Sequence, residues 1–120
     1  MDKYVKIMIV DDSSFMRQVL RDILTAAGFV RFVEFDSGHE CLERFEAEKP
    51  DLVLLDIIMP EVNGLEVLKK IGAKAKVVVI SAVGQEKVIE EAKRHGALDY
   101  IVKPFDEKEV LEKITKILGG

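Results

Sequence analysis

A regular alternation of short β-branched runs with helical patterns constrains the fold of this chain more than any other feature. Five expected strands recur at near-constant spacing: Lys6–Val10, Val30–Phe35, Leu52–Leu55, Val77–Ile80 and Tyr100–Val102. Between them, apolar residues recur at i, i+3 and i+4, which is typical of amphipathic helices. Strict alternation implies right-handed crossovers and a parallel sheet with helices on both faces. We therefore predict an α/β domain, a doubly wound (βα)5 fold.

The expected helices are marked by their apolar positions and by the residues that stop them. They comprise the apolar positions of Phe15–Leu24 before Gly28, Cys41–Phe45 before Pro50, Leu65–Ile71 after Gly64, Val88–Ala92 before Gly96, and Val110–Leu118. Asp106 and Glu109 are spaced as a capping box for the last helix. The first, third and fourth strands are continuously apolar, as buried parallel strands are. Arg31 and Glu34 make the second strand alternate, which predicts an edge strand.

Length and composition favour one folded domain over residues 1–120. The chain has 48% hydrophobic and 33% charged residues, which excludes intrinsic disorder. Its apolar runs are far shorter than the about 20 residues of a transmembrane helix, and no signal peptide is visible. A lone Cys41 excludes an intramolecular disulfide and fits a reducing cytoplasm. A net charge of −4 argues against a nucleic-acid partner. We expect a cytoplasmic monomer without membrane contact.

Polar residues follow the expected strands at their carboxyl ends. Asp11 and Asp12 follow the first strand, Asp56 the third, Ser81 the fourth and Lys103 the fifth. In doubly wound sheets, ligands bind at these ends, where the strand order reverses. If the order is 2-1-3-4-5, the first and third strands are neighbours about 4.8 Å apart. The three aspartates would then converge in one crevice.

Three converging carboxylates repel one another by roughly 3 kcal/mol per pair, at about 5 Å and an effective dielectric constant near 20. Either their pKa values rise or a cation lies among them. Oxygen ligands without Cys or His favour Mg²⁺, or Mn²⁺, over zinc. The alternative is that each aspartate only caps the following helix. That explains Asp12 alone, but not three aspartates together with Ser81 and Lys103.

Other chemistries fit the residues less well. The glycines form neither a dinucleotide-binding fingerprint nor a P-loop. Asp11 and Asp12 would repel the phosphate of a flavin nucleotide. A Mg²⁺-dependent aspartate-nucleophile phosphatase is the nearest different class, but it carries a second acid two residues after the nucleophile, where this chain has Ile58. His39 and His95 fall on expected helices, away from the strand ends, and we interpret them as surface residues.

Motifs spread over the whole chain resemble those of response-regulator receiver domains, especially the stand-alone chemotaxis type. The motifs are Val10–Arg17, Asp56–Gly64, Ser81–Ala82 and Tyr100–Phe105. The resemblance implies a flavodoxin-like, CheY-like three-layer sandwich with parallel strand order 2-1-3-4-5. It also implies a two-component response regulator, which is a phosphoacceptor rather than an enzyme.

The resemblance also assigns the metal-site residues. Asp56 matches the phosphoacceptor, which takes a phosphoryl group from a kinase phosphohistidine. Asp12 matches the direct Mg²⁺ ligand, and Asp11 matches the acid that holds the metal through water. Ile58 matches the position that lends a backbone carbonyl to the metal.

Three further positions match the residues that respond to the phosphoryl group. Lys103 matches the lysine that pairs with the phosphoryl oxygens, and its bond to Pro104 resembles the family's cis peptide. Ser81 matches the hydroxyl that moves toward the phosphoryl group. Tyr100 matches the aromatic that rotates inward, although an ordinary half-buried strand aromatic remains the alternative.

The resemblance further indicates the partners and the lifetime of the signal. Ser13–Arg17 and Ser81–Gln85 resemble chemotaxis regulators of non-enteric microbes. We expect a histidine kinase as phosphodonor, a downstream protein such as a flagellar motor switch component, and a separate phosphatase. An excised receiver, or a single-domain receiver of another phosphorelay, is the alternative. Apolar Ile58 and Val83 flank the expected approach of water, which predicts slow autodephosphorylation.

Overall fold

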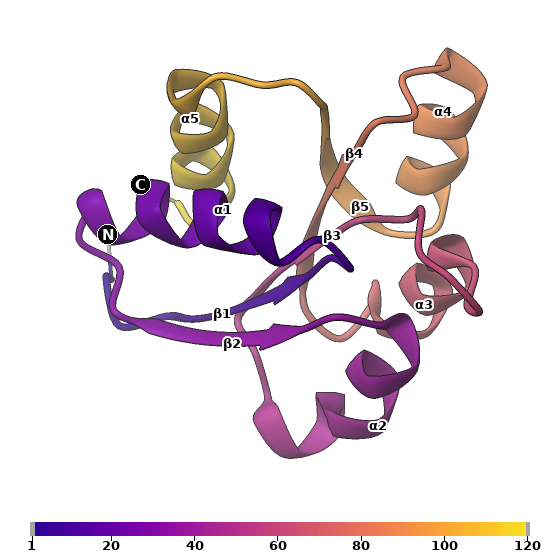
Figure 1. The fold of residues 1–120 in the computed structure, drawn as a ribbon, viewed down its shortest axis with the longest axis horizontal. Coiled ribbons are helices and arrows are strands. Elements are labelled where there is room, and N and C mark those ends of the chain that lie inside the picture. The colour runs from indigo at the N-terminus through magenta and orange to yellow at the C-terminus, as the bar shows by residue number, and fades with distance from the viewer. Residues whose placement is uncertain (1, 120) are drawn as a thin grey trace.

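The computed structural model describes residues 2–119 and confirms the alternating architecture (Figure 1). In chain order the elements are β1 Lys6–Val10, α1 Ser14–Ala26, β2 Arg31–Phe35, α2 Gly38–Glu48, β3 Leu52–Leu55, α3 Gly64–Ile71, β4 Lys76–Ser81, α4 Glu86–Arg94, β5 Ala97–Val102 and α5 Glu107–Ile117. The five strands form one parallel sheet in the predicted order β2-β1-β3-β4-β5. The order reverses between β1 and β3, so the carboxyl ends of these two strands lie side by side.

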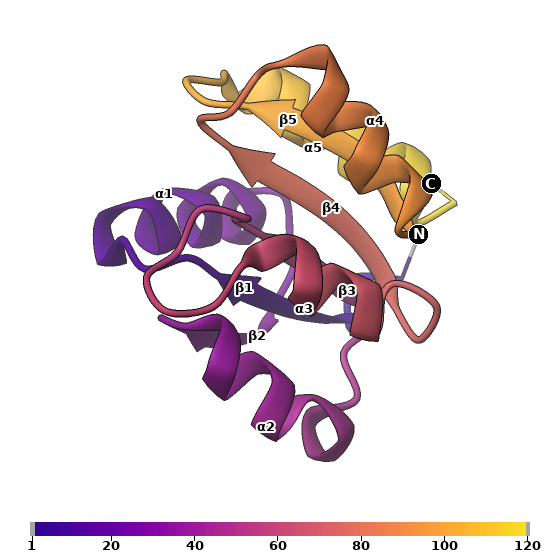
Figure 2. The ribbon, with the colours of Figure 1, turned by 90° about the vertical axis from the view of Figure 1, so that its right-hand side faces the viewer.

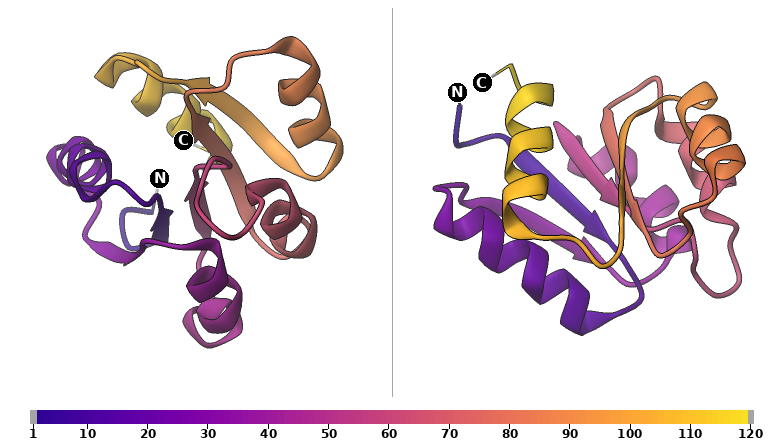
Figure 3. Two further views of the ribbon diagram at one scale, coloured as in Figure 1. Left: turned by 45° about the vertical axis from the view of Figure 1, so that its right-hand side comes forward. Right: turned by 90° about the horizontal axis from the view of Figure 1, so that it is seen from above.

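The sheet is covered on both faces, which gives three layers. Helices α1 and α5 lie on one face, and α2, α3 and α4 lie on the other (Figures 1 and 3), while Figure 2 shows the strands between them from the side. Strand β1 contributes side chains to both hydrophobic cores, one on each face of the sheet. Met8 and Val10 pack toward α2–α4, whereas Ile7 and Ile9 pack toward α1 and α5. All four side chains are fully buried, as the continuous apolar run predicts.

The boundaries of β1 and β3 agree with the prediction, whereas those of β2, β4 and β5 differ; β4 spans Lys76–Ser81 and so extends one residue beyond the predicted Val77–Ile80 at each end. Strand β2 is an edge strand, as expected. It begins at Arg31, which is the first residue paired with β1, and the preceding Val30 is 59% exposed. Strand β5 begins at Ala97 instead of Tyr100. Its first residues pair irregularly, with a register shift opposite Val77 and Val78, which an apolar pattern does not reveal.

Helix α1 begins at the N-cap Ser13, whose side chain accepts a hydrogen bond from the Met16 N–H at 3.2 Å. The expectation that Phe15 lies on the buried face of this helix is wrong, because its side chain is 74% exposed. The helix buries Leu20 and Leu24 against the sheet. At about 100° per residue, Phe15 points some 140° away from Leu20. The aromatic side chain is therefore left in solvent near the carboxyl end of β1.

Helix α5 has only half of the predicted capping box. The Asp106 carboxylate accepts a hydrogen bond from the Glu109 N–H at 2.7 Å. The Glu109 carboxylate, however, lies 3.3 Å from the Lys113 ammonium, one turn further along the helix. Among residues 2–119, no helix is long and apolar enough to cross a membrane.

Candidate functional site

The carboxyl ends of β1 and β3 bring three carboxylates together. One oxygen from each of Asp11, Asp12 and Asp56 lies within 4.8 Å of the others. Asp11 is 2% exposed and Asp56 is 6% exposed, while Asp12 is open to solvent. The predicted convergence of the aspartates is therefore present. It is the one acidic or metal-ligating cluster of this kind among residues 2–119.

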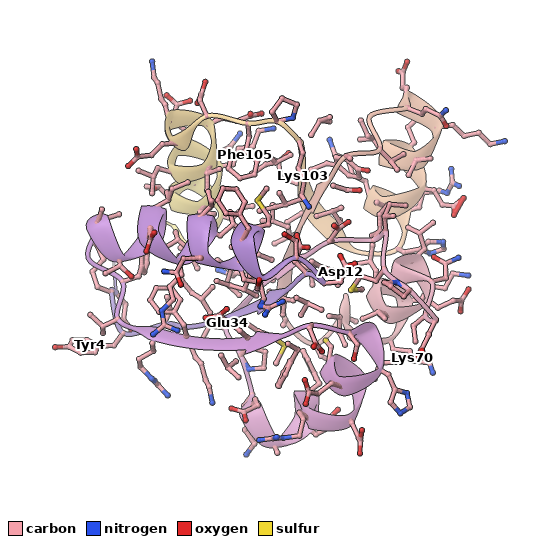
Figure 4. All side chains as sticks on the ribbon, in the orientation of Figure 1. Tyr4, Asp12, Glu34, Lys70, Lys103 and Phe105 are labelled. Carbon is pink, nitrogen blue, oxygen red and sulfur yellow. The ribbon has the colours of Figure 1, made fainter. Side chains whose placement is uncertain are left out.

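Lys103 supplies the positive charge of the site. From the end of β5, its ammonium donates hydrogen bonds to Asp11 Oδ2 at 2.8 Å and to Asp56 Oδ2 at 2.9 Å. Figure 4 shows Lys103 and Asp12 at the same end of the sheet. Burial by itself would lower the pKa of Lys103, but the two hydrogen bonds and the carboxylate charges raise it above its usual range. One ammonium is thus bonded to two of the three carboxylates of the cluster.

The remaining oxygens of the two buried carboxylates are fixed by local turns. Asp56 Oδ1 accepts a hydrogen bond from the Ile58 N–H at 2.8 Å, and Asp11 Oδ1 accepts one from the Ser13 N–H at 2.9 Å. In both cases an aspartate bonds the backbone two residues further on, as in an Asx turn. The Asp12 carboxylate has no hydrogen-bond or ion-pair partner within residues 2–119.

Ser81 and Tyr100 meet through the backbone of Val83. Ser81 is fully buried at the end of β4, and its hydroxyl accepts a hydrogen bond from the Val83 N–H at 3.3 Å. The Tyr100 hydroxyl donates to the Val83 carbonyl. Tyr100 is 4% exposed, and its pKa is raised first by burial and further by the nearby charge of Asp56. In this structure Tyr100 therefore lies inward.

The other predicted positions have the following places. The Ile58 side chain is 55% exposed beside Asp56, and the Lys103–Pro104 peptide is cis. His39 is exposed on α2, and half-buried His95 caps the end of α4. Cys41 packs against Met8, and burial raises the pKa of its thiol to about 11, so it stays protonated.

Sequence reasoning missed two cationic residues that touch the site or its neighbours. Arg17 donates to the carbonyl oxygen of Asp11 at 2.6 Å, and Lys113 donates to the carbonyl oxygen of Tyr100 at 2.9 Å. In the sequence, Arg17 is only the last residue of the motif Val10–Arg17, with no role assigned to it, and no motif singles out Lys113. Their acceptors are backbone oxygens, which leave no trace in residue identity.

The family model of the response regulator receiver domain matches residues 7–115 of this chain. The chain belongs to this family. This receiver is 44% identical to the chemotaxis protein CheY of Thermotoga maritima, over 93% of this chain and 96% of that protein. The predicted family and fold are thereby confirmed.

Two solved structures resemble this receiver over nearly its whole length. One is CheY in the CheX–CheY–BeF3–Mg²⁺ complex from Borrelia burgdorferi, with a TM-score of 0.90, 33% identity, and coverage of 95% of this chain and 89% of that one. The other is the response regulator domain of Thermotoga maritima CheB, with a TM-score of 0.86, 36% identity and 98% coverage of both chains.

The donor set of this receiver fits a hard divalent cation. It consists of carboxylate oxygens within 4.8 Å, and Lys103 offsets only part of their negative charge. Such oxygens are the ligands that Mg²⁺ and Mn²⁺ prefer. The cluster can therefore hold a metal ion.

Proposed function

We propose that this receiver is a two-component response regulator that accepts a phosphoryl group from a histidine kinase on Asp56, in a reaction that needs Mg²⁺ or Mn²⁺. The arrangement of Asp56 carries the proposal. Its buried carboxylate lies between the Lys103 ammonium and the Ile58 N–H, with the carboxylates of Asp11 and Asp12 within 4.8 Å. A nucleophile held in this way is oriented before the donor arrives.

In the proposed reaction, a carboxylate oxygen of Asp56 attacks phosphorus, the bond from phosphorus to the histidine nitrogen breaks, and an acyl phosphate forms. Asp11, Asp12, Asp56 and the Ile58 carbonyl would hold the metal, which would supply charge to offset the phosphoryl oxygens. Lys103 is already bonded to Asp56 Oδ2 and can shift its hydrogen bonds to the incoming oxygens. Ser81, at the end of the neighbouring strand, offers its hydroxyl proton to the same group.

The contacts of Val83 suggest how phosphorylation of Asp56 could change the conformation of a surface of the protein. Phosphorylation adds close to two negative charges and strong acceptor oxygens. A Ser81 hydroxyl that moves toward the phosphoryl oxygens would displace the Val83 N–H, from which it now accepts a hydrogen bond. The Val83 carbonyl accepts a hydrogen bond from the Tyr100 hydroxyl, so the same loop residue links the proposed phosphorylation site to β5. We propose Ser81 and Tyr100 as the switch residues of a face made by α4, β5 and α5.

The named relatives support a role in chemotaxis. Stand-alone CheY proteins match nearly the full length of the chain, and the Borrelia burgdorferi relative was solved with CheX. We therefore propose a cytoplasmic monomer whose partners are a histidine kinase, a flagellar motor switch component and a phosphatase. The alternative of a receiver from another phosphorelay or a larger protein rests on the likeness to the CheB domain. An aspartate-nucleophile phosphatase is disfavoured, because the position of its second acid is Ile58.

Phosphorylation by a small donor tests this function directly. The protein is incubated with acetyl phosphate and Mg²⁺, and intact mass is measured. Wild type should gain one phosphoryl group, Asp56→Asn should gain none, and omission of the metal should suppress the gain. Asp36→Asn is the matched control, because Asp36 also follows a strand but is exposed and outside the cluster. Stable phosphate on a serine with Asp56 unmodified would refute the assignment.

A further inference from the structure

Arg17 connects the metal-binding end of β1 to the edge strand β2. Its guanidinium donates to the Asp11 carbonyl oxygen at 2.6 Å and, through Nε, to Glu34 Oε1 at 3.2 Å. In Figure 4, Glu34 projects from β2 below α1, and Asp12 lies beyond the first turn of that helix. We propose that Arg17 is a positioning residue that orients the Asp12 carboxylate for the metal and so sets the affinity for Mg²⁺. This inference rests on the function proposed above.

Asp12 needs such support more than its neighbours do. The carboxylates of Asp11 and Asp56 are buried and are each held by a backbone N–H and by Lys103. The Asp12 carboxylate is exposed and has no such partner within residues 2–119. Its position therefore depends on the direction in which its Cα–Cβ bond leaves the backbone.

The contact of Arg17 controls that direction. The carbonyl of Asp11 and the N–H of Asp12 belong to one planar peptide group. A hydrogen bond to the Asp11 oxygen fixes the rotation of this plane, and with it the backbone that carries the Asp12 side chain. Asp11 lies just beyond β1 and is buried, so its carbonyl needs a partner from outside the strand ladder.

The guanidinium is itself well anchored. Arg17 and Glu34 have side chains that are 17% and 27% exposed, so their ion pair is largely sheltered from water. The second oxygen of Glu34 accepts a hydrogen bond from Arg21 at 2.9 Å, one turn further along α1. A planar guanidinium can hold Glu34 with one nitrogen and the Asp11 carbonyl with another, which a lysine ammonium cannot do in the same geometry.

Charge and geometry predict opposite effects when Arg17 is removed. By Coulomb's law alone, loss of a cation near three carboxylates strengthens the binding of Mg²⁺. Loss of the support to the Asp11–Asp12 peptide weakens it. Mutation of a residue that orients a metal ligand typically lowers the affinity for the metal by about 10- to 100-fold. Because Glu34 offsets the charge of Arg17 at 3.2 Å, we expect the geometric effect to dominate.

Titration with Mg²⁺, without a phosphodonor, decides whether removal of Arg17 strengthens or weakens the binding of Mg²⁺. The chain contains no tryptophan, so backbone amide NMR is the readout. Arg17→Ala should raise the dissociation constant about tenfold. Arg31→Ala removes the same charge from the exposed start of β2, where its guanidinium contacts the Tyr4 carbonyl and neither Asp11 nor Glu34, and it should bind Mg²⁺ as tightly as wild type or more tightly. Binding by Arg17→Ala that is equal to or tighter than wild type would overturn the proposal.

A metal-free measurement separates this proposal from the proposed function. Order parameters of the Asp12 and Ser13 amides should fall in Arg17→Ala but not in Arg31→Ala. Unchanged order at Asp12 overturns the positioning role even where wild type binds Mg²⁺ and is phosphorylated. A wild type that binds no Mg²⁺ overturns the proposed function itself, and this inference with it. If Arg17→Ala does not fold, Arg17→Lys takes its place, because it keeps the charge but loses the two-sided contact, and its affinity should still be lower than wild type.

Discussion

The ammonium of Lys103 lies 2.9 Å from Asp56 Oδ2, in a pocket of negative charge where it also holds Asp11 at 2.8 Å. Lys103 follows β5 and Asp56 follows β3, and these two strands are separated in the sheet by β4. The Lys103 side chain thus extends from the end of β5, past the end of β4, to the carboxylates that follow β1 and β3.

Removal of Asp12 should nearly abolish the binding of Mg²⁺. Asp12 contributes the accessible carboxylate of the cluster, whereas Asp11 and Asp56 are already engaged by Lys103. Wild type should bind Mg²⁺ weakly, because the site keeps few protein ligands, as is usual for this ion. Amide NMR titration compares Asp12→Ala with the control Asp36→Ala. Equal affinity of Asp12→Ala and wild type would contradict the metal assignment.

Removal of Lys103 should destabilise the protein at neutral pH. Lys103→Met leaves two buried carboxylates without their cation, and breaking a buried pair costs about 3–5 kcal/mol. Urea unfolding at pH 7 measures the loss. Lys108→Met is the control, because Lys108 lies on the exposed face of α5, 3.9 Å from Glu112. A midpoint equal to that of wild type would contradict the expected loss of stability.

The contribution of Lys103 should also depend on pH in one direction. Burial disfavours its charge, but bonds to Asp11 and Asp56 raise its pKa above the usual 10.5. A raised folded-state pKa stabilises the fold fully below the unfolded value, and this stability is lost as pH rises through the folded value. The difference in unfolding free energy between wild type and Lys103→Met should therefore be constant near neutral pH and shrink above about pH 10.5. A difference that grows over this range would reverse the sign of the linkage.

The acyl phosphate should be long-lived unless a phosphatase acts. Hydrolysis needs a water in line with the bond to Asp56, and the side chains expected to flank that path are Ile58, 55% exposed, and Val83. Neither can hydrogen-bond and orient the water, and each tenfold change in rate needs only about 1.4 kcal/mol. After removal of a small phosphodonor, wild type should lose phosphate more slowly than Ile58→Asn/Val83→Glu. An unchanged rate in the double variant would show that the backbone and the metal dominate.

Substitution of Gly64 should disturb the loop that carries Asp56 and Ile58. A Cβ at Gly64 would lie 2.2 Å from the Cα of Ile57, so the backbone of one segment must move. Overpacking of this kind costs about 1–3 kcal/mol. Gly64→Ala should lower the thermal midpoint and reduce phosphorylation by acetyl phosphate, as measured by calorimetry and intact mass. A crystal structure of Gly64→Ala with an unmoved Ile57 would contradict this expectation.

The central strands and the aspartate cluster could be predicted because they depend on short-range patterns. Continuous burial on both faces defines β1 and β3 to the residue, and the position of Asp56 directly after β3 follows from it. The link from Arg17 to Glu34 could not be predicted. It depends on the register of β1 with β2, in which Ile9 lies opposite Glu34, and on the rotation of α1 about its axis. That rotation also leaves Phe15 in solvent.

The charged residues of the site come from the ends of three strands, β1, β3 and β5, that are distant in the chain. Lys103 follows Asp56 by 47 positions and Asp11 by 92, and only the complete sheet brings their charged atoms within 3 Å. No partially folded chain that lacks β5 can present Asp56 with its lysine. A chain in which β5 is not docked on β4 therefore leaves Asp11 and Asp56 without the cation that holds them.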